Sequence, residues 1–116
     1  MKFEIKVEMI SGLKDNWDGY GACVPSNTVI GNCKLFYNYL CNKKVYMNSE
    51  DVVPTPYGTV DFDVLTANGT MISFEIGEKA IGYFFDDASK GKSNDITDIS
   101  FDKLDEIKEL DEVLSK

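Results

Sequence analysis

The sequence predicts an α+β fold: two helices packed on one face of a three- to four-stranded antiparallel meander, followed by a C-terminal helix. Three observations predict it. Apolar residues recur at helical spacing over residues 26–42, alternate with polar residues in three segments between 60 and 85, and recur every three or four residues in an acidic stretch over 100–116. With 116 residues and no internal repeat or linker, the chain is expected to form a single domain over 1–116.

The N-terminal segment, residues 2–9, fits two interpretations. Its apolar residues lie at helical spacing when Phe3, Val7 and Ile10 are taken together, but Phe3, Ile5, Val7 and Met9 also alternate as in a strand. Because the segment continues to Lys14 without a turn signal, we expect a helix over about residues 4–14.

A second helix is predicted from Ser26 to about Asn42. Serine is a favoured N-cap, since its hydroxyl can accept a hydrogen bond from a free amide of the first turn. Two neighbouring stripes of apolar residues give this helix a wide apolar face, of the kind that packs on a sheet. They consist of Val29, Cys33, Phe36 and Leu40, and of Ile30, Tyr37 and Cys41.

The middle of the chain is predicted to be strand. Residues 52–56 contain two prolines, so they form an edge strand or an extended lead-in. In the first hairpin, a three-residue loop over 67–69 pairs Val64 with Ile72 and keeps both apolar sets on one face. We therefore expect a type I turn with Gly69 in the left-handed region, rather than a two-residue turn.

A second hairpin is predicted to turn at Glu78-Lys79, pairing Ile76 with Ile81. One continuous apolar face then results, which two helices cover. The side chains expected on that face are Val60, Phe62, Ile72, Phe74, Ile76, Tyr83 and Phe85.

The last thirty residues divide into two predicted parts. Residues 87–99 are rich in glycine, serine, asparagine and aspartate and are expected to form a polar loop. Ser100 is then expected to cap an acidic C-terminal helix over 100–116. Its single apolar stripe comprises Phe101, Leu104, Ile107, Leu110 and Leu114, and we expect it to pack on its own domain.

The net charge of the chain indicates which classes of macromolecule it can bind. Twenty acidic residues face twelve cations, all lysine, so the net charge is −8. Without arginine or a basic surface, direct binding to nucleic acid or to anionic membranes is disfavoured. An acidic surface instead favours a basic protein as partner.

The absence of histidine limits the catalytic mechanisms and metal sites that the chain can form. It removes the commonest general base and metal ligand, so no catalytic triad can form, and no cofactor or metal is expected. An enzyme would have to use carboxylates, for which Asp18, Asp61, Asp63 and Glu75 are the candidates. The three cysteines have no CxxC spacing and are expected to be buried free thiols. With no signal-peptide pattern at the N-terminus, we expect a cytoplasmic protein.

The segment Asn16–Ala22 contains the single tryptophan on a glycine-rich loop. Trp17 and Tyr20 could bind a small molecule or peptide, because aromatic side chains on loops are a common binding device. The alternative is a structural turn, in which Trp17 seals the core between the two helices and Asp18 accepts hydrogen bonds from nearby amides.

The outer face of the meander carries the second candidate site. In the expected register Asp61 lies opposite Glu75 and Asp63 opposite Ser73, and like charges across a strand pair cost stability unless they are screened. Phe84 points to the same side, where it could anchor a basic partner or be covered by the N-terminal segment. We interpret this surface as a solvated acidic face or a docking face.

Two motifs carry a resemblance to a known family. The sequence Leu13–Ala22 (LKDNWDGYGA), followed by a helix after Pro25-Ser26, and Val53–Val60 (VPTPYGTV) before the meander resemble a family of small, uncharacterised bacterial proteins. These share an "NWDGYGA" loop and a "PTPxG" strand lead-in. The resemblance covers about residues 8–85 and implies a two-helix plus antiparallel-sheet domain of bacterial or phage origin, with no catalytic residue to carry over. Cys23-Val24 departs from the family pattern.

These observations favour a non-enzymatic, acidic protein-binding module, such as an antitoxin- or immunity-type neutraliser of a basic partner. The alternatives are a small-molecule or peptide binder that uses Trp17 and Tyr20, and a carboxylate-based enzyme. A homo-oligomer could form through the C-terminal helix or a sheet edge.

Overall fold

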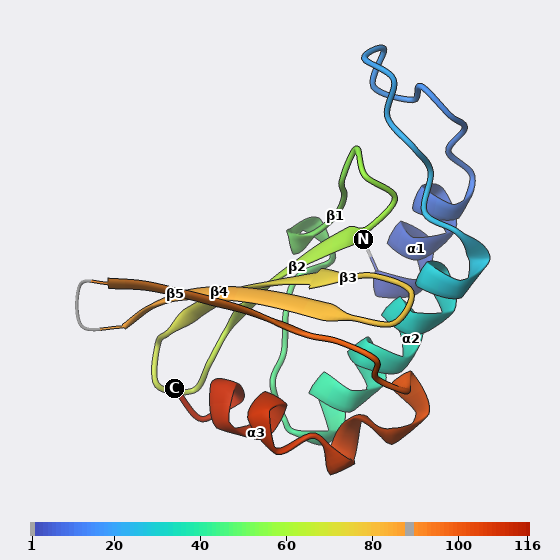
Figure 1. Ribbon diagram of the computed structural model, residues 1–116. Helices are drawn as coiled ribbons and strands as arrows, with labels where there is room; N and C mark the ends of the chain where they lie inside the picture. The colour runs from blue at the N-terminus through green and yellow to red at the C-terminus, as the bar shows by residue number, and fades with distance from the viewer. Residues whose placement is uncertain (1, 88–89) are drawn as a thin grey trace.

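The computed structural model describes residues 2–87 and 90–116 and shows an α+β fold, as the sequence predicts. A five-stranded antiparallel sheet has its strands in sequence order, β1-β2-β3-β4-β5. The helices α1, α2 and α3 all lie on one side of it (Figure 1). The elements are α1 (Phe3–Ser11), α2 (Asn27–Asn42), the short 3-10 helix η1 (Ser49–Asp51), β1 (Val52–Pro54), β2 (Val60–Leu65), β3 (Met71–Ile76), β4 (Ile81–Asp87), β5 (Lys90–Ile96), the 3-10 helix η2 (Phe101–Glu106) and α3 (Lys108–Leu114).

The N-terminal segment is a helix, which settles the two interpretations of residues 2–9. Phe3, Val7 and Ile10 are buried, whereas Ile5 and Met9 are 51% and 55% exposed. A strand would have buried both of these together with Phe3 and Val7. Helical spacing therefore explains the burial, and α1 ends three residues earlier than expected, at Ser11.

Helix α2 begins and ends where the sequence predicts. The Ser26 hydroxyl accepts a hydrogen bond from the Val29 amide at 3.2 Å. Phe36 inserts between helix and sheet, with its ring centroid 5.3 Å from that of Phe62 and 5.0 Å from that of Phe74. The first predicted stripe is fully buried, and of the second Ile30 is buried while Tyr37 and Cys41 are half-buried.

Both hairpins have the predicted register. Val64 pairs with Ile72, and the loop over 67–69 closes with Gly69 at φ 85°, the left-handed conformation that its missing side chain permits. In the second hairpin Ile76 pairs with Ile81. All seven predicted inner-face side chains are buried: Val60, Phe62, Ile72, Phe74, Ile76, Tyr83 and Phe85. As expected, β1 is a short edge strand that ends at Pro54.

The prediction of a polar loop over 87–99 was wrong. Lys90–Ile96 forms β5 and pairs with β4 along seven residues; residues 88 and 89 of the predicted loop lie outside the described residues. Residues 91–95 are exposed, and over 91–96 Ile96 alone has an apolar side chain. The backbone ladder with β4 therefore holds this strand rather than an apolar face. Composition alone therefore gave no strand signal.

The prediction of one continuous C-terminal helix was also wrong. Ser100 makes no side-chain cap, Lys103 has non-helical torsions (φ −127°, ψ 34°), and the chain is extended at Ile107 (φ −92°, ψ 100°). Two short helices, η2 and α3, result. The break lets each of them bury its own apolar pair on the domain's core: Phe101 and Leu104 from η2, and Leu110 and Val113 from α3.

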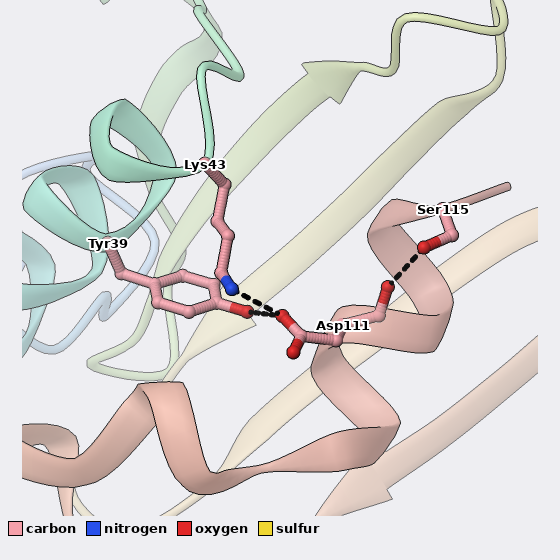
Figure 2. A network of polar contacts seen from close by, with 4 residues as sticks. All are labelled: Tyr39, Lys43, Asp111 and Ser115. Atoms are coloured by element: carbon pink, nitrogen blue, oxygen red, sulfur yellow. Dashed lines mark hydrogen bonds and ion pairs between the residues drawn. The ribbon is translucent and has the colours of Figure 1, made fainter.

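Polar contacts fix α3 in place, so the cover of the sheet has three helices rather than the expected two. Asp111 Oδ1 accepts a hydrogen bond from the Tyr39 hydroxyl at 2.8 Å and lies 3.1 Å from the Lys43 ammonium, both on or next to α2 (Figure 2). These contacts lower the pKa of Asp111. On β4, the Tyr83 hydroxyl donates to Glu109 Oε2 at 2.7 Å. Helix α3 is thus tied to both α2 and the sheet.

Candidate functional site: the acidic outer face of the sheet

Helices α1, α2 and α3 leave the outer face of the sheet uncovered (Figure 1). The strand register aligns the residues of this face in rows. One row crosses all five strands and consists of Val53, Asp61, Glu75, Gly82 and Asp95. The next row consists of Asp63, Ser73, Phe84 and Ser93. We call this surface, with Leu65 and Met71 at its end, the outer face.

Asp61 is the electrostatic centre of the outer face. The pKa of Asp61 is raised, first by its partial burial and then by the nearby carboxylates Glu75 and Asp63. Asp63 and Glu75 each accept a hydrogen bond, from Ser73 Oγ at 2.7 Å and from Thr59 Oγ1 at 2.6 Å. Ionised Asp61 therefore faces uncompensated negative charge.

No lysine of the described chain neutralises this surface. Among the side chains that the structure describes, those of residues 2–85 and 91–116, the ion pair found is Lys43–Asp111, on the opposite side of the sheet. The outer-face rows contain carboxylates, serines and apolar side chains. A cation from outside the chain would relieve the repulsion that burial intensifies.

Gly82 opens a notch in the middle of the outer face. A Cβ atom at this position would lie 2.8 Å from Asp95 Oδ1, so the missing side chain is what lets the Asp95 carboxylate lie over β4. The notch is part of an open hollow of about 520 Å³, which Asp61, Glu75 and Phe84 also line. Phe84 is 50% exposed, and helix α1 lies on the other side of the sheet (Figure 1).

Sequence reasoning found most, but not all, of this surface. The alternation in β2–β4 predicted that Asp61, Asp63, Glu75 and Phe84 share the face, and the structure brings them there. Asp95 was missed because β5 was expected to be a loop. No apolar alternation marks β5, so the sequence offered no signal for its place in the row.

The loop that carries Trp17 is held by its own hydrogen bonds. Asp18 Oδ1 accepts from the amides of Tyr20 and Ala22 at 2.8 and 3.1 Å, and Asn16 Oδ1 accepts from the Gly21 amide at 2.6 Å. Asp18 is therefore occupied by the local backbone, as the structural interpretation expected. The loop extends away from the body of the molecule in Figure 1.

Trp17 does not lie between the two helices. Its indole Nε1 donates to the Cys23 carbonyl at 3.0 Å. The ring borders a hollow of about 190 Å³ together with Met9 and Leu13, from or next to α1, and Pro54 of β1. Tyr20 is 93% exposed, and Trp17 lines a different hollow from Asp61 and Glu75 of the outer face. The two predicted groups of site residues are thus separate.

The two motifs behind the family resemblance meet in space. Cys23 forms a parallel bridge with Tyr57, and its amide donates to the Pro56 carbonyl at 2.8 Å. Gly58 has φ 83° and lies against Val24. A Cβ atom added to Gly58 would be 3.5 Å from the Val24 carbonyl oxygen. The loop over 15–24 and the strand lead-in over 54–59 therefore support each other.

The cysteines differ in exposure. Cys33 is buried, which raises the pKa of its thiol to about 12, and Cys41 is half-buried. Cys23 is exposed, so the expectation that all three would be buried was wrong for this one. The glycine-rich turn before it carries the chain along the surface.

The described residues show neither a metal-binding cluster nor a membrane-spanning helix. No group of three or more cysteine or acidic side chains among them is arranged to hold a metal ion. No helix in the described ranges is long and apolar enough to cross a bilayer.

Comparisons of the chain with protein-family models, with curated proteins and with solved structures found no match. The resemblance to the "NWDGYGA" family stays a prediction.

Proposed function

We propose that this protein is a non-enzymatic binding module whose outer face docks a basic protein, in the manner of an antitoxin or immunity protein. The observation that supports this most is the alignment of Asp61, Glu75 and Asp95 in one row of the outer face, in which no lysine stands. Partial burial and the nearby carboxylates raise the pKa of Asp61, as expected for charge without a counterion. A basic partner would supply the missing countercharge. Complementary charge of this kind speeds encounter and selects the partner.

The shape of the outer face also favours a protein partner. It is a broad surface across five strands, with exposed Phe84, Leu65 and Met71 among the carboxylates. Aromatic and methionine side chains are typical of the centre of protein interfaces. Such a mixture suits a partner that buries apolar groups and pairs lysine or arginine at the same time.

A carboxylate-based enzyme is the competing function, since Asp61 and Glu75 line one hollow. That hollow is open, and Glu75 and Asp95 are exposed on it. Catalytic carboxylates with shifted pKa values usually lie in sheltered clefts. We therefore prefer docking to catalysis for this face.

The test compares two double variants that remove the same charge. Asp61→Asn/Glu75→Gln changes the outer face, and Asp102→Asn/Glu106→Gln changes exposed positions on η2. A lysine-serine alternating decapeptide is titrated at low salt by NMR. We expect the first variant to weaken its binding about tenfold and the second to leave it nearly unchanged. Equal weakening by both would mean that the peptide senses only net charge, and the proposal would fail.

A further inference from the structure

A second hollow opens at the end of the outer face, where β2 loses its neighbour. The short strand β1 pairs with β2 only as far as Phe62, so the remainder of β2 has a free edge. The segment that joins α2 to η1 passes this edge. Together they enclose a hollow of about 330 Å³, which is lined by Tyr46, Met47, Asn48, Asp51, Asp63, Leu65 and Met71.

The lining of this hollow combines three chemistries. Leu65, Met71 and Met47 give it apolar walls, and the Tyr46 ring is 72% exposed beside them. Asp51 and Asp63 contribute two half-buried carboxylates. One Asp63 oxygen accepts the Ser73 hydrogen bond at 2.7 Å, and in the described ranges no lysine pairs with either carboxylate.

This combination selects its ligand. An anion would meet two carboxylates, and a purely apolar group would desolvate them without compensation. A lysine or arginine side chain fits all three chemistries, because its aliphatic stem can pack on the apolar walls while its charged head reaches a carboxylate. Its cation can also lie over the tyrosine ring, where the negative face of the ring attracts it.

We infer that this hollow receives one lysine or arginine side chain of the basic partner and so serves as an anchor at the edge of the interface. The inference rests on the proposed function, since the hollow adjoins the docking face through the Asp63–Ser73 hydrogen bond. It adds the position of the anchor and the identity of the residues that hold it. Tyr46, Met47 and Asp51 lie outside the sheet's outer-face rows, and sequence analysis singled out none of them.

The test separates the hollow from the face as a whole. N-acetyl-arginine amide and N-acetyl-lysine amide are titrated into the labelled protein and followed by NMR, with neutral N-acetyl-norleucine amide as the comparison. We expect the two cationic probes to shift the amides of residues 46–51 and 63–71, and norleucine to leave them unmoved. Tyr46→Ala and Asp63→Asn should each weaken this binding about two- to fivefold.

Control variants are available in the chain. Tyr20→Ala removes another highly exposed tyrosine, and Asp102→Asn removes an exposed carboxylate that lies outside the hollow. Both should leave the titration unchanged. If the decapeptide binds the outer face but the cationic amides do not move residues 46–51, the anchor is wrong and the proposed function stands. If the decapeptide does not bind the outer face, both are wrong.

Discussion

The two faces of the sheet are built from alternate residues of the same strands, yet they have opposite characters. On the inner face Phe74 is fully buried against Phe36, and three helices exclude water. On the outer face Glu75, the next residue along, is exposed among other carboxylates. The difference shows that the two faces contribute differently to the fold. The inner face stabilises it by burying apolar side chains, whereas the outer face carries carboxylates whose mutual repulsion does not favour folding.

The largest expected effect breaks the inner face. Phe74→Ala removes a ring that contacts Phe36 from the centre of the sheet, so it should lower the free energy of unfolding by about 3–5 kcal/mol. Phe84→Ala, one strand away on the outer face, removes an equal ring and should change it by no more than about 0.5 kcal/mol. Urea denaturation of both variants measures the contrast. Similar losses would show that the outer face also supports the fold.

A smaller effect is expected at the polar rim of the inner face. Tyr83→Phe removes the hydroxyl that donates to Glu109 at 2.7 Å and should cost about 1 kcal/mol. The hydrogen bonds from Tyr83 and Asn94 lower the pKa of Glu109, so their stabilisation is present above pH 4.5 and is lost as the pH falls through the lowered value. The difference between wild type and Tyr83→Phe should therefore shrink in acid.

The smallest effect is expected for Asp61→Asn on the outer face. Unlike the two inner-face variants, it should raise the free energy of unfolding. Since the pKa of Asp61 is raised in the folded state, its ionisation destabilises the fold as the pH rises from 3.8 through the raised value. Asp61→Asn should thus stabilise the protein at pH 7, by about 0.5 kcal/mol, and have no such effect below pH 3.8. Asp102→Asn serves as the control. A loss of stability at pH 7 would mean that Asp61 has a structural partner.

If Asp61→Asn stabilises the fold and also weakens binding of the basic peptide, the two results together carry more weight than either alone. A residue that lowers stability while it improves binding is expected at a site shaped for a partner. Chemical denaturation and NMR titration of the same sample would measure both.

The sequence allowed the central hairpins to be predicted in register, because a one-residue slip would have placed Phe62 and Ile72 on opposite faces. It could not predict β5, whose pairing with β4 depends on backbone hydrogen bonds that any polar segment can make. Nor could it predict the break at Ile107, because apolar residues three apart suit one long helix as well as two short ones.

The candidate site, too, is predicted only in part by the sequence. Strand alternation alone predicts that Asp61, Asp63 and Glu75 share one surface. The notch at Gly82 depends on Asp95 from the unexpected strand, and the hollow beside Tyr46 depends on β1 beginning only at Val52, opposite Phe62. These features follow from how separate segments meet, which no local pattern in the chain records.

The strict sequence order of the strands has a consequence for how the chain reaches this structure. Each strand pairs with the one that precedes or follows it, so the sheet can grow hairpin by hairpin, and closure of long loops is needed mainly to bring the helices onto it. Proteins dominated by such short-range pairings fold faster than sheets with crossed connections. Stopped-flow refolding should therefore show a fast main phase, one that replacing the acidic outer-face residues leaves almost unaltered.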